Sequence, residues 1–286
     1  MASKPDRSNL VGSKRRIALI LLIVAVIIAL PLCFQGYREF HAWNLERLMR
    51  FYKVRQNFPT VEGQSLIAQV IQGEINDVLM TAKSVPGGVN ATGTDGLTPL
   101  RVAVFRLNLS MVRALLKAGA NPDGDPRQTP LEMAVKAYDL TIARTLLEAG
   151  ANPDGPPGSE PPLLEAATIN YREAVDLLLS AGAHIDAPDP LGYTASIDAA
   201  LAGHLDMTDY LLDRGGSLWV TEKLGITIPI LLNGAPTQPK IIEAQQHLIA
   251  RYKAAHWPWP PPSSKEVKTL MDEGKWPPKD AIGATP

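Results

Sequence analysis

The sequence predicts an all-α solenoid of stacked helix pairs joined by short loops, with one apolar segment in front of it. Three observations predict this fold. A leucine-rich segment recurs at intervals of 31 to 33 residues, a Thr-Pro-Leu type of segment precedes each copy, and one long uncharged run lies near the N-terminus. A period of this length is typical of helical repeat proteins, in which each unit buries its apolar face against its neighbours.

The leucine-rich segment occurs four times. Its copies are Leu115–Asp123 (LLKAGANPD), Leu146–Asp154 (LLEAGANPD), Leu178–Asp186 (LLSAGAHID) and Leu211–Gly216 (LLDRGG). The paired leucines predict the buried face of the second helix of each unit. The glycine that follows them predicts the end of that helix, because helices often terminate in a left-handed conformation that glycine adopts most easily. These glycines are Gly119, Gly150, Gly182 and Gly215.

A second motif lies upstream of each copy and predicts the start of the first helix. Its versions are Thr98-Pro99-Leu100, Thr129-Pro130-Leu131, Pro162-Leu163-Leu164 and Thr194-Ala195-Ser196. A threonine hydroxyl can accept hydrogen bonds from the free N–H groups of a helix start, and proline is tolerated in the first turn. Small residues follow at one position, where neighbouring helices must approach closely: Ala103, Ala134, Ala167 and Ala199.

Together these motifs resemble the ankyrin repeat. The stretch Ala199–Asp206 (AALAGHLD), continuing to Leu211-Leu212, matches the repeat pattern best. The resemblance covers about residues 64–256, with four clear repeats over 94–220 and degenerate repeats as N- and C-terminal caps. It implies a solenoid of helix-turn-helix repeats with finger loops. Separately from the repeats, the dense apolar run near the N-terminus and the sequence rich in proline and tryptophan favour a membrane-anchored, bacterial member of the family.

This chain departs from the ankyrin pattern at two features. The histidine that usually follows Thr-Pro-Leu is absent, and by the motif alignment Arg101, Glu132, Glu165 and Ile197 stand there. This alignment places Glu132 and Glu165 at equivalent positions one repeat apart. The fingers also differ, because one has only five residues (GDPRQ) and the next (GPPGSEP) carries three prolines. Prolines cannot donate to a backbone ladder, so we expect no regular hairpin in that finger.

Ankyrin arrays generally bind proteins through the finger loops and the concave face that the first helices form. The resemblance therefore implies an unknown protein partner on this side of the array. The positions that correspond to such contacts are Asp95, Leu97, Arg101, Arg127, Gln128, Glu132, Glu160, Glu165, Leu191 and Tyr193.

The run from Ile17 to Tyr37 contains no charged residue and predicts a transmembrane helix over residues 17–37. Twenty-one helical residues span about 31 Å, the thickness of a bilayer's hydrocarbon core. A cleaved signal peptide is the alternative, but no small-residue cleavage site follows the run. Leu32 also argues against lipidation of Cys33, because the residue before a lipidated cysteine is usually small. We expect an uncleaved anchor that contacts the lipid bilayer.

Lys14, Arg15 and Arg16 border the anchor on its N-terminal side, which favours an N-terminus inside the cell. Residues 1–16 would then be a cytoplasmic tail and the repeats would lie in the periplasm. Over a wider window the basic residues balance on the two sides, so a cytoplasmic array is the alternative.

Two further segments flank the array. Residues 38–63 predict a juxtamembrane helix or linker, whose aromatic residues would lie at the lipid headgroups or pack on the first repeat. Residues 257–286 are rich in proline and tryptophan and include one predicted short helix at 265–274. This tail is either a peptide motif that a partner recognises or a segment that folds back over the last repeat and buries its tryptophans. We favour the second arrangement.

Composition excludes several functions. A net charge of −1 over 286 residues argues against general nucleic-acid binding, and one cysteine excludes an internal disulfide or a cysteine-based zinc site. The five histidines lack metal-ligand spacing, and no phosphate-binding or nucleophile motif occurs. We expect no cofactor, metal, catalytic residue or small-molecule substrate. The expected function is a membrane-tethered scaffold or inhibitor; the alternatives are an immunity protein for a co-encoded toxin, or an enzyme with chemistry in the tail.

Overall fold

The computed structural model describes residues 58–233 and 239–278, and all of its secondary structure there is helical. No helix in these ranges is both long and apolar enough to cross a membrane. The predicted anchor at 17–37, the tail at 1–16 and residues 38–57 of the juxtamembrane segment lie outside the described residues.

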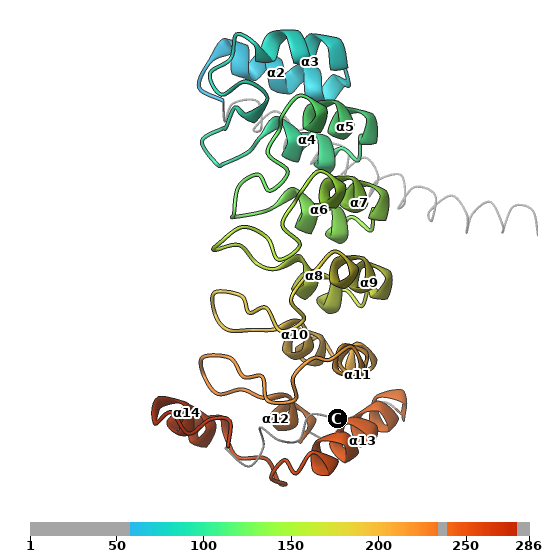
Figure 1. Ribbon diagram of the computed structural model, residues 1–286, viewed down its shortest axis with the longest axis vertical. Coiled ribbons are helices and arrows are strands. Elements are labelled where there is room, and N and C mark those ends of the chain that lie inside the picture. The colour runs from blue at the N-terminus through green and yellow to red at the C-terminus, as the bar shows by residue number, and fades with distance from the viewer. Residues whose placement is uncertain (1–57, 234–238, 279–286) are drawn as a thin grey trace, which may run out of the picture. The chain divides into compact units, whose positions relative to one another are not determined.

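Within the described residues, helices follow one another in pairs, as the sequence predicts. The first helices of the first five pairs are α2 (Val61–Gln72), α4 (Pro99–Phe105), α6 (Pro130–Lys136), α8 (Pro162–Thr168) and α10 (Ala195–Leu201). Their second helices are α3 (Ile75–Ala82), α5 (Leu109–Lys117), α7 (Leu140–Glu148), α9 (Arg172–Ser180) and α11 (Leu205–Asp213). Each pair packs on the next, and the finger loops lie on the side away from the second helices (Figure 1).

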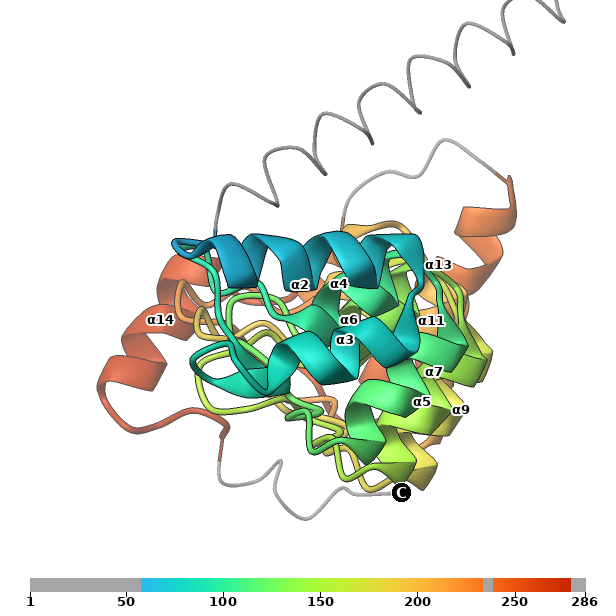
Figure 2. The same cartoon turned by 90° about the horizontal axis from the view of Figure 1, so that it is seen from above.

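Viewed along the stack, α5, α7 and α9 lie one behind another, so the pairs repeat with little change in orientation (Figure 2). The first leucine of each predicted motif is fully buried: Leu115, Leu146, Leu178 and Leu211. The second leucine is only half-buried in three of the four copies. The predicted helix ends are confirmed, because Gly119, Gly150, Gly182 and Gly215 have φ between +90° and +97°.

The observed starts of the first helices show that the predicted alignment of one repeat, the one that contains α8, is wrong. Thr98 and Thr129 cap α4 and α6, with their hydroxyls accepting from the backbone N–H three residues on at 3.2 and 3.1 Å. The matching position before α8 is Pro161, not Pro162. Leu164, and not Glu165, is therefore the counterpart of Glu132, and Ala166 replaces Ala167 in the small-residue position. In the repeat with the seven-residue, proline-rich finger, the motif alignment therefore began one residue too late.

A ladder of side-chain hydrogen bonds joins each repeat to the next on the loop side. An asparagine or aspartate in one repeat accepts from the backbone N–H of the next repeat at 2.7 to 2.9 Å. The pairs are Asn90 with Asn121, Asp123 with Asn152, Asp154 with His184, and Asp186 with Ser217. The ladder gives the acidic residue at the end of each GANPD-type motif a structural role, because it satisfies N–H groups that have no helical partner.

The turn between the two helices of a pair requires a left-handed backbone. Gly203 adopts it with φ +80° in the repeat that matches the family pattern best, but the same position holds Leu107 (φ 53°), Tyr138 (φ 58°) and Asn170 (φ 56°) in the preceding repeats. A side chain in this conformation costs about 1–2 kcal/mol relative to glycine. Leu107 is also 48% exposed, so packing recovers little of that cost, whereas the ring of Tyr138 contacts that of Tyr171 in the next repeat with centroids 4.8 Å apart.

We therefore expect Leu107→Gly to stabilise the array by about 1 kcal/mol, because glycine removes the strain and little buried surface is lost. Denaturant unfolding of the full chain in detergent micelles measures this change. The reverse substitution, Gly203→Leu, is the matched control and should destabilise by a similar amount. A loss of stability in Leu107→Gly would show that the leucine makes a contact that outweighs the strain.

The last repeat is closed by a different arrangement. The short α12 (Ile228–Leu232) and the long α13 (Pro239–Ala254) form the sixth pair, and α13 packs against α11 and α12. A cluster of buried side chains holds this end together, and it includes Leu248, Tyr252 and Trp257. The ring of Trp257 stacks on Trp219 with centroids 4.0 Å apart.

The tail after α13 returns to the finger side of the last pair, where α14 (Ser264–Asp272) begins with a capping box formed by Ser263 and Glu266. Val267 of α14 is fully buried, and Met271 lies 4.0 Å from the Thr221 hydroxyl in the last finger. Trp257 is 3% exposed, and Trp276 packs edge-on against it at 5.4 Å. The favoured prediction for this part of the tail, folding back with burial of tryptophan, is confirmed.

Candidate functional site

The candidate face consists of the finger loops and the exposed side of the first helices. Aspartate or glutamate organises four of the fingers by accepting from backbone N–H groups further along the loop, and in one of them Asp125 accepts from Arg127 at 3.0 Å. Asp95 accepts from Leu97, Asp189 from Leu191 and Tyr193, and Glu222 from Leu224 and Ile226, at 2.8 to 3.1 Å. The proline-rich finger closes differently, because Ser159 donates from both its backbone N–H and its hydroxyl to the Pro156 carbonyl. These bonds fix the direction in which the loop side chains point.

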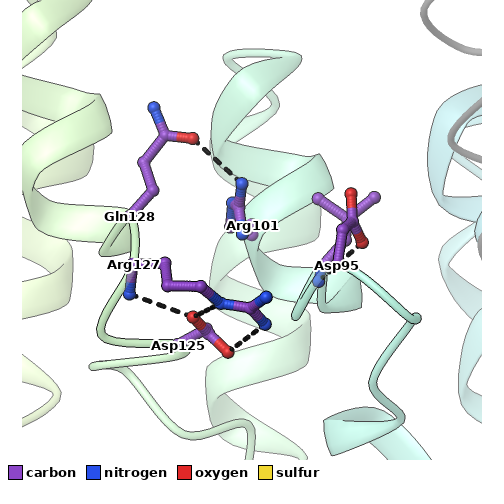
Figure 3. A network of polar contacts seen from close by, with 6 residues as sticks. Asp95, Arg101, Asp125, Arg127 and Gln128 are labelled. Carbon is purple, nitrogen blue, oxygen red and sulfur yellow. Dashed lines mark hydrogen bonds and ion pairs between the residues drawn. The ribbon is translucent and has the colours of Figure 1, made fainter.

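A network of arginine and aspartate occupies the first two described fingers (Figure 3). Arg127 donates to both carboxylate oxygens of Asp125 at 2.8 and 2.9 Å, and this hydrogen bonding lowers the pKa of Asp125 to about 2. Arg101 reaches across from the preceding repeat and donates to the amide oxygen of Gln128 at 2.9 Å. Three of the predicted residues, Arg101, Arg127 and Gln128, are therefore brought together in one place.

Gly96 explains how closely these two fingers approach each other. A Cβ at this glycine, which has φ +77°, would lie 2.0 Å from an Arg127 nitrogen and 2.2 Å from an Asp125 oxygen. The ion pair therefore lies directly on the backbone of the preceding finger. Burial lowers the pKa of Arg101, while the carboxylates of Asp95 and Asp125 act in the opposite direction. The guanidinium groups remain the cationic part of the face.

Carboxylates gather on the next three repeats. Glu160, at the end of the proline-rich finger, is electrostatically coupled to Glu132 and Glu165 on one side and to Asp189 and Asp198 on the other. Burial, followed by repulsion from these neighbours, raises the pKa of Glu132 and Glu160, and raises that of Asp198 to about 6. Lys136 pairs with Glu165 at 3.2 Å and compensates part of the negative charge. The face thus changes from a mixed arginine–aspartate network to an acidic surface.

The predicted residues differ in how much of their surface is available. Leu191 is 59% exposed, and Asp95, Arg127 and Glu160 are also exposed. Leu97 and Glu132 are buried, so Leu97 contributes to packing within its finger and Glu132 reaches the surface only in part. Tyr193 is half-buried against the C-terminal core. The exposed residues define the surface that a partner could touch.

The acidic surface contains two residues that the sequence prediction missed, Asp189 and Asp198. Asp198 occupies the same position in α10 that Glu165 occupies in α8, four residues after Pro161 or Thr194. The turns between paired helices, at Asn170 and Gly203, would have aligned these two repeats correctly, because both residues take the left-handed conformation at the same repeat position. Among the described residues, no three side chains are grouped as metal ligands.

The family of these repeats follows from a comparison with protein-family models. Residues 66–157 match the model for ankyrin repeats in three copies. The match runs from within α2 through the pairs α4–α5 and α6–α7, so it includes most of the first pair, which the sequence predicts to be a degenerate cap. No curated protein matches the chain.

The ankyrin geometry continues beyond the matched residues. The pairs α8–α9 and α10–α11 keep the left-handed turn, the terminal glycine and the hydrogen-bond ladder of the matched pairs. The described chain is thus an all-α array of repeated helix pairs consistent with an ankyrin solenoid. Ankyrin repeats suggest protein–protein interaction and are typically non-catalytic.

The raised pKa of Asp198 predicts a dependence of stability on pH. The folded state binds the proton of Asp198 more tightly than the unfolded chain, whose ordinary aspartate pKa is 3.8. Ionisation therefore costs stability as pH rises through the window from about 4 to about 6, and the full cost remains at neutral pH. Because the side chain is partly exposed, we discount the cost to about 1 kcal/mol.

We expect Asp198→Asn to stabilise the array by about 1 kcal/mol at neutral pH and to have no such effect below pH 4, where the aspartate is already neutral. Denaturant unfolding of both proteins across this pH range tests the expectation. A stabilisation that stays constant with pH would attribute the effect to packing instead of charge.

Proposed function

We propose that this protein is a membrane-tethered ankyrin-repeat protein that binds a partner protein through its finger loops and concave face. The proposal joins the protein-binding role that ankyrin repeats suggest to the uncharged segment Ile17–Tyr37, which has the length of a membrane span. With the N-terminus inside, the array would lie in the periplasm. In this proposal the array acts as a scaffold that holds its partner protein near the membrane, or as an inhibitor of that partner.

The observation that carries the binding proposal is the arrangement of charge along the candidate face. Glu160 and Leu191 are exposed on neighbouring fingers, and carboxylates with raised pKa values lie around Glu160. Like charges held together cost stability unless an opposite charge approaches them. A partner segment with lysine or arginine would relieve this repulsion, while the exposed Leu191 would offer an apolar contact beside it.

Site-specific photo-crosslinking in cells tests the binding face. The full chain carries a photo-reactive amino acid in place of Leu191, and a matched variant carries it in place of Met80, which is 65% exposed on the second helix α3. We expect one discrete adduct from position 191 and none from position 80. The same adduct from both positions would contradict binding through the fingers. The absence of an adduct from position 191 in the native host cells would contradict it too.

Orientation is tested by fusing a reporter that is active only in the periplasm to the C-terminus. Activity is the expected result, because the basic residues Lys14, Arg15 and Arg16 favour a cytoplasmic N-terminus. A matched fusion that lacks residues 17–37 should lose the activity. Activity of a cytoplasmic reporter at the same position would place the array inside the cell.

A further inference from the structure

Leu191 and Leu224 occupy equivalent places in the two fingers that precede α10 and α12 (Figure 1). Each is the third residue of a four-residue turn, 189–192 or 222–225, in which the last residue donates its N–H to the carbonyl of the first at 3.0 Å. The glycine that closes the turn is left-handed, with φ +97° in one finger and +82° in the other. Leu191 is 59% exposed and Leu224 is 66% exposed. The two turns therefore hold a large apolar side chain in water on each of two adjacent fingers.

The turn itself does not require leucine at this place. The first finger has the same turn over residues 93–96, closed by the left-handed Gly96, and Asp95 stands there instead. A single exposed leucine is ordinary on a protein surface. The same exposed leucine at one turn position of two adjacent fingers indicates a surface that contacts another molecule.

The two fingers and the tail form one rigid support for these leucines. Lys223 joins the fingers, because its backbone N–H donates to the Leu191 carbonyl at 3.2 Å and its ammonium donates to the Pro190 carbonyl. A Cβ at Gly192 would lie 3.2 Å from the Lys223 backbone nitrogen, and one at Gly225 would lie 2.3 Å from a backbone oxygen of α14. The leucines are thus held in place before a partner arrives, which lowers the entropic cost of binding.

The surface beside the first of these turns is acidic. Glu160 is exposed on the preceding finger and is electrostatically coupled to Asp189, in the turn of Leu191, and to Asp198 in α10. Lys136 also acts on Glu160, but it already pairs with Glu165 at 3.2 Å. A cationic side chain from a partner would therefore be attracted to the Glu160 side of the leucines.

The other side of the leucine pair carries a cation. Lys223 is exposed and directly precedes Leu224 in its turn. The charge along the row of fingers therefore changes from negative at Glu160 to positive at Lys223, with Leu191 between them. This polarity fixes the direction of a bound segment, because a cation placed over Lys223 would be repelled.

We propose that the last two fingers bind a segment of a partner protein that carries a lysine or arginine beside two apolar side chains. The cation lies over Glu160, and the apolar side chains lie on Leu191 and Leu224. Adjacent repeats stack about 8–10 Å apart, so the two apolar side chains are spaced by about the same distance. This inference rests on the finger-loop binding proposed above and names the chemistry of the bound segment. It also gives α14 a role, as the support of the last finger.

Photo-crosslinking from the second leucine tests the placement. The full chain carries a photo-reactive amino acid in place of Leu224, and a matched variant carries it in place of Leu107, which is 48% exposed in the turn between α4 and α5. We expect position 224 to capture the same protein that position 191 captures, and position 107 to capture none. Mass spectrometry of the crosslinked partner peptide should find lysine or arginine beside apolar residues.

Substitutions separate the apolar contact from the charge. Leu191→Ser should lower the crosslinking yield from position 224 about tenfold, the effect of losing one apolar contact, and Leu107→Ser should leave it unchanged. Glu160→Lys should lower the yield by a similar factor, whereas Glu148→Lys, at an exposed position at the end of α7, should not. The substituted side chains are exposed, so the array stays folded, and hydrogen exchange in α10 checks this. Reversing the charge of the captured partner residue should restore the yield with Glu160→Lys.

The outcomes distinguish this inference from the proposed function. An adduct from position 191 without one from position 224 would overturn the inference and leave binding through the fingers in place. The absence of an adduct from position 191 would remove the proposed function and the inference together. The inference would also be overturned by a yield that Glu160→Lys leaves unchanged, by a captured segment without lysine or arginine, or by an adduct with a second copy of this chain.

Discussion

Replacing Trp257 by alanine is expected to lower the free energy of unfolding of the C-terminal pair by about 3–5 kcal/mol, the usual cost of removing a buried tryptophan. Trp257 is 3% exposed and contacts three other aromatic rings, those of Trp219, Tyr252 and Trp276. Its removal leaves a cavity between α13, the last finger and the tail. The terminal repeat has a neighbour on one side only, so it has little other packing to hold it in place.

Hydrogen exchange of the full chain in detergent micelles measures this loss by region. Amides of α12 and α13 should exchange much faster in Trp257→Ala, while those of α4 and α6 change little. Trp259→Ala is the matched control, because Trp259 is half-buried and has Lys253 above its ring, so its loss should cost about 1 kcal/mol or less. Equal effects of the two substitutions would contradict the central position of Trp257.

Gly225→Ala is expected to destabilise the packing of α14 on the last finger by about 3 kcal/mol. Gly225 has φ +82°, and a Cβ there would lie 2.3 Å from the Ser264 carbonyl oxygen and 2.8 Å from the Lys268 backbone nitrogen. The clash is with backbone, which cannot rotate away as a side chain can. Strain in φ adds about 1–2 kcal/mol, and overpacking adds a similar amount.

Gly182→Ala isolates the part of this effect that comes from backbone strain. Gly182 has φ +96° but nothing lies within 4 Å of the position of its Cβ. We expect Gly182→Ala to cost about 1–2 kcal/mol and to leave exchange in α14 unchanged. If Gly225→Ala costs no more than Gly182→Ala, the tail does not pack on the finger as described.

The repeat architecture was predictable because its signals are local. Glycine after a leucine-rich helix and threonine with proline before the next one each reflect a backbone requirement of a few residues, and Gly150 and Thr129 meet these requirements as expected. The folding back of the tail was also anticipated, because three large aromatic residues near a solenoid end favour covering it; Trp257 is buried, and Trp259 and Trp276 are half-buried against the same cluster.

The register of α8 and the acidic surface could not be predicted in the same way. The proline-rich finger contains adjacent prolines at 161 and 162, either of which could precede the helix by local rules. The raised pKa of Asp198 depends on Glu160 and Asp189, which come from two other loops and meet it only after the repeats stack. The strained Leu107 and Tyr138 were missed because the sequence alone assigns no conformation to a leucine or tyrosine in a turn.

The central claim is that the finger loops and concave face bind a partner protein. The most direct test is the affinity of the partner recovered through position 191 for the full chain carrying Arg101→Ala, Arg127→Ala and Tyr193→Ala together. Arg101 lies on the first helix α4, and Arg127 and Tyr193 lie in two different fingers of the face. We predict an affinity at least about tenfold weaker than for the unsubstituted chain, with unchanged hydrogen exchange in α6 and α8. An unchanged affinity of this folded variant would contradict the account.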